Sequence, residues 1–196
     1  PHLVLNLAYN LACLNKNYRN ISTAVERASK VVFALKSYAH YDHSGQKQKA
    51  VITEGIETVL ELYYNQIRQR DIKLVKQYPS TLTAILCYPD ELIQVWTNLV
   101  YNAIQAMEKQ GTLKIQVFKL EQEIVVAITD SGCGIPEEIC QKIFEPFFTT
   151  KPRGEGSGLG LDIVRRIVDK HQGKIAVESQ PGETTFQVFL PVGENY

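Results

Sequence analysis

The sequence of 196 residues is short of three features: excess charge of one sign, long apolar runs and paired cysteines. Its 21 acidic and 21 basic residues cancel, which argues against a nucleic-acid-binding or anionic-membrane-binding protein, because both usually carry a basic excess. No run approaches the roughly 18 apolar residues of a membrane span, and no signal peptide is visible. The four cysteines form no CxxC pair and no zinc-site spacing with histidine, so they argue for a reducing cytoplasm and against a Cys/His metal centre.

The chain opens at Pro1 without a methionine. We therefore expect a fragment of a longer protein, itself cytoplasmic and without membrane contact. The full-length protein is expected to be either soluble or attached to a membrane through segments upstream of Pro1.

Residues 1–45 carry two apolar stripes separated by a polar turn at 15–17. The second stripe repeats in alternating steps of four and three, the seam of a coiled coil or helix bundle. We predict an α-helical hairpin that is part of a dimerisation domain, and a homodimer in which two hairpins pair; a helix packed on its own domain is the alternative. The first stripe comprises Leu3, Leu7, Leu11 and Leu14, and the second Ile21, Val25, Ala28, Val32, Leu35 and Ala39.

Residues 46–196 alternate between strand and helix patterns. This predicts an α/β (α+β) domain, a two-layer α/β sandwich with a mixed sheet. Thr53 is expected to cap the first helix and Gly173 to end the last. The predicted strands are 49–53, 72–78, 83–88, 113–119, 124–129, 174–179 and 184–190, and the predicted helices are 53–69, 89–110, 136–143 and 161–171.

A polar stripe runs along the otherwise apolar helix 89–110, through Glu91, Gln94, Asn98, Asn102 and Gln105. Asparagine is a poor helix former, so two of them at i and i+4 need a compensating role. Their carbonyl oxygens suit a hydrated Mg²⁺, which favours phosphate oxygens plus one or two protein ligands. An ordinary solvent-exposed stripe is the alternative.

Two glycine-rich segments follow. Asp130 ends a strand just before Gly132 and Gly134, so its carboxylate can accept a hydrogen bond where the backbone turns sharply. The second segment, 154–161, opens a helix, where unpaired amide groups and the helix dipole favour phosphate. Three phenylalanines within 144–148 precede it and predict a hinged lid, on which Lys151 would meet a phosphate or simply be solvated.

Taken together, these segments resemble the boxes of the GHKL superfamily of gyrase, heat-shock chaperone, histidine kinase and mismatch-repair ATPases. Residues 96–103 resemble the N-box, 130–134 the first glycine box, 143–148 the F-box and 156–161 the second glycine box. The resemblance covers about residues 48–192. An F-box followed by Thr149-Thr150-Lys151 points to sensor histidine kinases of the nitrogen-regulator-like type.

The resemblance implies a Bergerat ATP-binding fold. Asp130 would accept a hydrogen bond from the adenine amino group, and Asn102 would ligate Mg²⁺ with Asn98 near the phosphates. Thr184 would lie near the adenine, although the turn before it lacks the second glycine common in the family. The candidate nucleotide-binding residues are Asp130, Gly132, Gly134, Ile135, Phe144, Phe148, Gly156, Ser157, Gly158, Leu159, Gly160, Leu161 and Thr184. The candidate catalytic residues are Asn98, Asn102 and Lys151.

Hydrolytic members of the superfamily carry a glutamate where Asn98 stands. An amide orients a group but takes no proton, which suits transfer of the γ-phosphate to another acceptor. Glu91 is read as a surface or structural residue and a fallback base. None of the four histidines, His2, His40, His43 and His171, has the acceptor context of a histidine kinase, so the acceptor is expected upstream of Pro1.

These observations predict the ATP- and Mg²⁺-binding catalytic domain of a two-component sensor histidine kinase, whose partner is a response regulator receiver domain. One alternative is a non-catalytic nucleotide-binding dimer module that signals through lid and bundle movement. Another is an anti-sigma-type protein-serine kinase, which shares the fold but normally lacks a dimerising hairpin.

Overall fold

A computed structural model of the chain describes residues 6, 9–11, 13–14, 16–17, 46–152 and 156–192. The chain divides into two compact units, one of Pro1–Ser44 with Thr149–Ser157 and the other of Gly45–Phe148 with Gly158–Tyr196. Most of the predicted helical hairpin lies outside the described residues. Lys16 and Asn17 are helical, so the predicted polar turn is wrong at these two positions.

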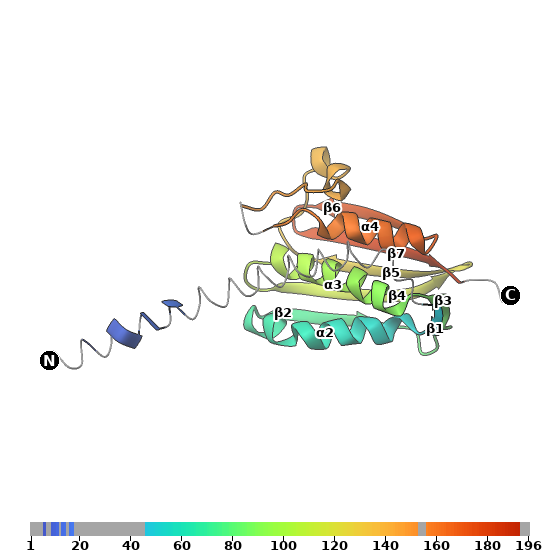
Figure 1. Cartoon of the computed structure of the whole chain (residues 1–196), viewed down its shortest axis with the longest axis horizontal. Helices are drawn as coiled ribbons and strands as arrows, with labels where there is room; N and C mark the ends of the chain where they lie inside the picture. Colours follow the sequence, from blue (N-terminus) through green and yellow to red (C-terminus); the bar gives the residue numbers. More distant parts are fainter. Residues whose placement is uncertain are drawn as a thin grey trace. The chain divides into compact units, whose positions relative to one another are not determined.

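The larger unit contains a mixed five-stranded sheet covered on one face by three helices (Figure 1). Strand β2 is parallel to β4, and the remaining neighbours are antiparallel in the order β2-β4-β5-β7-β6. The predicted two-layer sandwich with a mixed sheet is therefore confirmed. The elements are β1 Gln48–Ala50, α2 Ile52–Gln69, β2 Ile72–Gln77, β3 Ile85–Cys87, α3 Pro89–Ala106, β4 Gly111–Leu120, β5 Glu123–Asp130, the 3₁₀ turns η2 Glu137–Ile139 and η3 Lys142–Phe144, α4 Gly160–Lys170, β6 Lys174–Gln180 and β7 Glu183–Pro191.

The hydrophobic core fills the space between the helices and the covered face of the sheet. Alternate residues of β5, including Ile124, Val126 and Ile128, are at most 1% exposed, as expected of a central strand with its inner face on the core. From α3, Val95, Trp96, Leu99, Val100 and Ile104 pack against them and are also at most 1% exposed. These contacts fix α3 against the carboxyl end of β5, where Asp130 emerges.

Several predicted ends were wrong, and each has a local cause. The first long helix begins at Ile52 after Val51, without a side-chain cap, so Thr53 lies inside it. Helix α3 ends at Ala106, four residues early, because the chain turns at Met107 and Gln110 adopts a positive φ of 61°. Residues 136–143 form two separate 3₁₀ turns instead of one α-helix.

The end of α4 shows a Schellman motif. We predicted that Gly173 ends this helix, and Gly173 donates its amide to Val168 O at 2.9 Å. The residue with the left-handed conformation is Gln172 (φ 58°). Glycine is required at 173 because a Cβ there would lie 2.3 Å from the carbonyl oxygen of Phe189.

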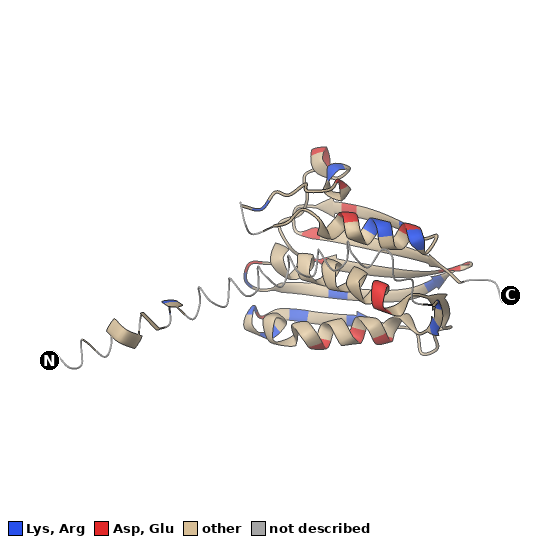
Figure 2. Ribbon diagram, in the orientation of Figure 1, with Lys and Arg blue, Asp and Glu red and all other residues tan. Residues whose placement is uncertain are grey.

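Charged side chains of both signs are spread over the described helices and strands (Figure 2).

Candidate functional site

Three polar residues form one row across adjacent strands on the helix-covered face of the sheet. Asp130 of β5 is the register partner of Thr184 of β7, and Thr184 is the partner of Ser179 of β6. Asp130 and Thr184 are both 3% exposed. The turn between β6 and β7 holds only Pro181 and Gly182 (φ 89°), so the glycine missing before Thr184 does not shift this residue away from Asp130.

Asp130 is a buried carboxylate, and one of its two oxygens accepts a hydrogen bond within the protein. Its Oδ1 accepts the backbone amide of Gly132 at 2.9 Å, and no described residue donates to Oδ2. Burial raises the pKa of Asp130 to about 6, and the Gly132 hydrogen bond only partly offsets this. The second oxygen is available to a donor brought by a ligand.

The first glycine segment is clamped to the turn between β6 and β7. Gly182 N donates to Gly132 O at 3.1 Å, and Ile135 N donates to Ser179 Oγ at 2.8 Å. Gly134 has a positive φ of 81°, and a Cβ there would lie 2.5 Å from the Gln180 carbonyl oxygen. Side chains larger than hydrogen therefore cannot fit at Gly134 without moving this backbone.

The same segment packs against the last turn of α3. A Cβ on Gly132 would lie 2.7 Å from the Ala106 carbonyl oxygen, and Cys133 N donates to that oxygen at 3.4 Å. Arg70, the C-cap residue of α2, donates through Nη1 to Ile104 O at 2.7 Å and Met107 O at 3.3 Å. A cation at the negative end of α3 satisfies carbonyls that the helix leaves unpaired.

The two asparagines of α3 are held differently. Asn98 Nδ2 donates to Gln94 O at 3.0 Å, which leaves Oδ1 directed at the start of α4, 3.1 Å from the position of a Cβ on Gly160. The amide of Asn102 has no hydrogen-bond partner within residues 46–152 and 156–192, and it is partly exposed. A free amide oxygen fits a hydrated Mg²⁺, which takes few protein ligands.

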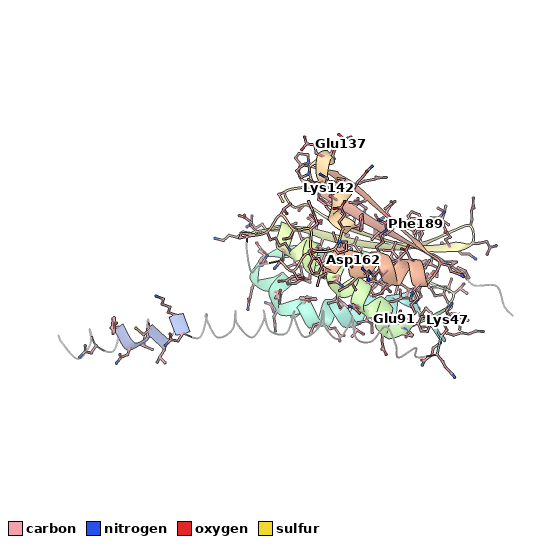
Figure 3. All side chains as sticks on the ribbon, turned by 45° about the horizontal axis from the view of Figure 1, so that its top comes forward. Lys47, Glu91, Glu137, Lys142, Asp162 and Phe189 are labelled. Carbon is pink, nitrogen blue, oxygen red and sulfur yellow. The ribbon has the colours of Figure 1, made fainter. Side chains whose placement is uncertain are left out.

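Helix α4 begins beside Asn98, with Leu159 as N-cap residue and Gly160 and Leu161 in its first turn. No side chain caps this end, so the amides of Gly160 and Leu161 are available to an anion. Asp162, labelled in Figure 3, is 6% exposed; its Oδ1 pairs with Arg166 Nε at 3.1 Å, and its Oδ2 is buried without a partner among the described residues.

The base of the predicted lid rests on aromatic packing. Phe144 meets Phe186 edge to face with ring centroids 6.5 Å apart, and Phe148 is partly buried against the core. Phe147 and Gly158 both have positive φ, 65° and 67°. A Cβ on Gly158 would lie 2.5 Å from Phe147 O, so the backbone at Phe147 and the backbone at Gly158 lie close together in the larger unit.

Three predicted site residues belong to the smaller unit: Lys151, Gly156 and Ser157. Within it Lys151 N donates to Thr149 Oγ1 at 3.1 Å, and a Cβ on Gly156 would lie 2.5 Å from the same oxygen. Their relation to Asp130 and Asn102 stays a prediction. All the other predicted site residues belong to the larger unit.

His171 and Glu91 take structural roles away from this row. His171 is 5% exposed; its Nε2 accepts the amide of Tyr88 at 3.0 Å and its Nδ1 donates to Ile167 O at 2.7 Å. Burial lowers its pKa. Glu91, labelled in Figure 3, pairs with Lys170 at 2.7 Å. His2, His40 and His43 lie outside the described residues.

The groove with the largest volume among those found in the described chain lies away from the predicted site residues. An open groove of about 470 Å³ over α2 and β2 is lined by Glu57, Glu61, Lys76 and Tyr78 and by none of the predicted site residues. Across the ranges that the structure describes, no cluster of three or more His, Cys, Asp or Glu side chains forms a metal site. No helix within those ranges is long and apolar enough to cross a membrane.

Sequence reasoning missed two parts of the site, Ser179 and the carbonyl of Ala106. Ser179 carried a signal: it lies five residues before Thr184 across Pro181-Gly182, and a two-residue turn pairs such positions. Ala106 carried none, since its role depends on where α3 ends.

Residues 87–194 match the family model described as histidine kinase-, DNA gyrase B-, and HSP90-like ATPase. The sensor histidine kinase ZraS of Escherichia coli K12 is 41% identical over 168 residues, 85% of this chain and 36% of ZraS. The catalytic domain of the histidine kinase ThkA superposes with a TM-score of 0.70 at 34% identity, over 76% of this chain and 99% of that domain. ThkA in complex with the response regulator TrrA gives 0.72 at 30% identity, over 86% of this chain and 49% of ThkA. The chain spans about 20 to 51% of the curated relatives it matches.

Proposed function

Because the chain belongs to the family of histidine kinase-, DNA gyrase B- and HSP90-like ATPases, we propose that it binds ATP with Mg²⁺ as the catalytic part of a two-component sensor kinase. The γ-phosphate would pass to a histidine outside the described residues and then to a response regulator. The observation that carries this proposal is Asp130, a buried carboxylate with one oxygen bonded to Gly132 and the other free.

At the base end, Asp130 Oδ2 would accept the adenine amino group. A hydrogen bond to an ionised buried acceptor is strong and specific, because a base without that donor leaves a buried charge unsatisfied. Thr184 lies beside Asp130 in the row, and the backbone of Gly132 to Ile135 supports this edge through its clamp to the β6–β7 turn.

At the phosphate end, the free amides of the first turn of α4 would face the phosphates, together with Gly158. Asn102 would hold Mg²⁺, which when bound neutralises phosphate charge. Asn98 Oδ1 is directed at the same turn. Since Asn98 is an amide, it can orient a group but not remove a proton from water. This chemistry favours transfer to an external nucleophile over hydrolysis.

The acceptor is not His171, whose two ring nitrogens are both bonded inside the domain. We propose that the acceptor lies in a segment beyond this fragment, and that the N-terminal helices pair in a homodimer. Lys151 would approach the phosphates from the lid.

The decisive experiment incubates the full-length protein with γ-labelled ATP and treats the product with acid and with base. Label that is lost in acid and kept in base is expected, as for a phosphohistidine. Acid-stable label would instead support a serine kinase, and ATP binding without any label would support a non-catalytic nucleotide-binding module.

A further inference from the structure

Ser179 was not among the residues predicted for the site, yet it joins three of its parts. Its Oγ accepts the Ile135 amide at 2.8 Å and lies 2.8 Å from Thr184 Oγ1. A longer contact of 3.4 Å reaches the carbonyl of Glu183. Ser179 is thus the third member of the row that begins with Asp130.

The hydroxyl groups of this cluster have few hydrogens to donate, which limits the possible hydrogen-bond directions. A hydroxyl has one hydrogen to donate and two lone pairs. Because Ser179 Oγ already accepts from Ile135, its single hydrogen goes either to Thr184 Oγ1 at 2.8 Å or to Glu183 O at 3.4 Å. In the second case Ser179 accepts from Thr184 as well as from Ile135, so the Thr184 hydrogen is used. The 3.4 Å contact is long for an O–H···O hydrogen bond, so a ligand acceptor beside Thr184 favours the first case, in which Ser179 donates to Thr184. When Ser179 donates to Thr184, the hydrogen of Thr184 is left for a ligand acceptor.

A Thr184 hydroxyl that is held as a donor affects which nucleotide base the site prefers. Asp130 offers an acceptor, and a Thr184 hydroxyl supplied by Ser179 offers a donor next to it. Adenine presents the complementary order along its pairing edge, an amino donor beside the N1 acceptor. Guanine presents the reverse, the O6 acceptor beside an N1–H donor. A wrong base would leave buried polar groups unpaired.

We propose that Ser179 is a positioning residue that sets adenine specificity by fixing the Thr184 hydroxyl as a donor, reaching the base directly or through one water. This rests on the proposed function, in which Asp130 takes the adenine amino group. Ser179 itself does not touch the nucleotide; it acts on the base through Thr184, and the Ile135 amide holds the Ser179 hydroxyl in place.

The test measures equilibrium binding of ATP, GTP and inorganic tripolyphosphate to the 196-residue chain with Mg²⁺. For Ser179→Ala, ATP affinity is expected to fall about three- to tenfold, the equivalent of one hydrogen bond. GTP and tripolyphosphate affinities are expected to stay unchanged, so the preference for ATP over GTP falls by the same factor. Ser179→Thr keeps the hydroxyl and is expected to restore the preference.

A matched control is available on the other face of the same strands. Thr185 Oγ1 lies 2.9 Å from Thr129 Oγ1, so Thr185→Val removes a cross-strand hydroxyl pair next to the site without touching the row. It is expected to leave the ATP-to-GTP ratio unchanged.

A parallel loss of all three ligands in Ser179→Ala would overturn the inference, because it would indicate a general structural defect. An additive loss when Ser179→Ala is combined with Thr184→Val would also overturn it, since a residue acting through Thr184 has no effect once that hydroxyl is gone. Failure of the proposed function looks different: Asp130→Asn would then leave ATP affinity unchanged.

Discussion

Asp130 and His171 are both buried titratable side chains of the same unit, but they differ in how completely their polar atoms are hydrogen-bonded. Both ring nitrogens of His171 are hydrogen-bonded to the backbone, at Tyr88 and Ile167. Asp130 has one bonded oxygen and one left free. The satisfied His171 serves the fold, whereas the free oxygen of Asp130, at a strand end beside Gly132 and Gly134, is a candidate contact for a ligand.

The two groups also act oppositely on stability as the pH changes. Burial raises the pKa of Asp130 from 3.8 to about 6, so the stability linked to its bound proton is present below pH 3.8 and is lost as pH rises through 6. Burial lowers the pKa of His171 from 6.5, so its contribution is present above pH 6.5 and is lost as pH falls through the folded value.

The largest expected effect is on stability at His171. Substitution His171→Ala leaves the Tyr88 amide and the Ile167 carbonyl without their partner and opens a cavity between the start of α3 and the end of α4. We expect the free energy of unfolding to fall by about 2–4 kcal/mol. Urea denaturation measures this directly.

Lys170→Ala is the control for His171→Ala. It removes the partly exposed ion pair with Glu91 and the contact of Lys170 Nζ with the Tyr88 ring, 4.5 Å from its centroid. It is expected to lower stability by about 0.5–2 kcal/mol, less than His171→Ala. ATP affinity of the folded His171→Ala protein should match the wild type; a loss of affinity as large as that of Asp130→Asn would end the contrast between the two residues.

The second effect is on binding at Asp130. Substitution Asp130→Asn replaces the charged acceptor, so ATP affinity is expected to fall by about 1.5–3 kcal/mol, or about 10- to 150-fold. At pH 7.5 the same change should raise the stability of the nucleotide-free protein by about 1–3 kcal/mol, because it removes a poorly solvated charge. Titration calorimetry and urea denaturation on one preparation measure both.

Asp169→Asn on the exposed side of α4 is the control for Asp130→Asn and should change neither quantity by more than about 0.5 kcal/mol. Unchanged ATP affinity in Asp130→Asn would refute the adenine assignment. A loss of stability in that variant would show that Asp130 serves the fold, as His171 does.

The contrast between Asp130 and His171 also marks what could be predicted. Period-two and 3.6 patterns predicted the long helices α2, α3 and α4 and the strands β4, β6 and β7, in which buried and more exposed positions recur with the period of the element. The role of Asp130 was predicted from the resemblance of residues 130–134 to the first glycine box, because a carboxylate before two glycines is a weak signal alone. His171 was read as structural or exposed. The sequence did not decide between these, since one of its two hydrogen bonds comes from Tyr88, 83 residues earlier in the chain.

The predicted ends of several helices were wrong, because contacts with distant parts of the chain help to determine where a helix starts and stops. Thr53 has the residue type of a cap, but the helix starts one residue earlier. Gln172 takes a conformation that glycine would take more easily, because Gly173 is needed against the Phe189 carbonyl. Ser179 was within reach of the sequence, since the short turn pairs it with Thr184, but the direction of its hydrogen bond depends on Ile135.

The third effect distinguishes the contribution of Mg²⁺ to ATP affinity from the contribution of the adenine contact at Asp130. Asn102→Ala removes the free amide that fits Mg²⁺, so the ratio of ATP affinity with Mg²⁺ to that with EDTA should fall about fivefold. The exposed Glu108→Gln, just beyond the end of α3, is the control. An unchanged ratio would assign the metal to other residues and leave the Asp130 prediction standing.

The smallest effect is a pH dependence that only Asp130 should confer. Since its pKa is about 6, nearly all Asp130 is ionised at pH 7.5 and about a quarter at pH 5.5, so ATP affinity should fall about fourfold over this range. The terminal phosphate of ATP also titrates near pH 6, and Asp130→Asn corrects for that because it keeps the phosphate site. The difference in slope between wild type and Asp130→Asn is therefore the quantity to measure. Equal slopes would mean that the carboxylate does not need its charge to hold the nucleotide. In the same pH series without nucleotide, Asp130→Asn should remove the loss of stability as pH rises through 6 and leave untouched the loss at low pH that comes from His171.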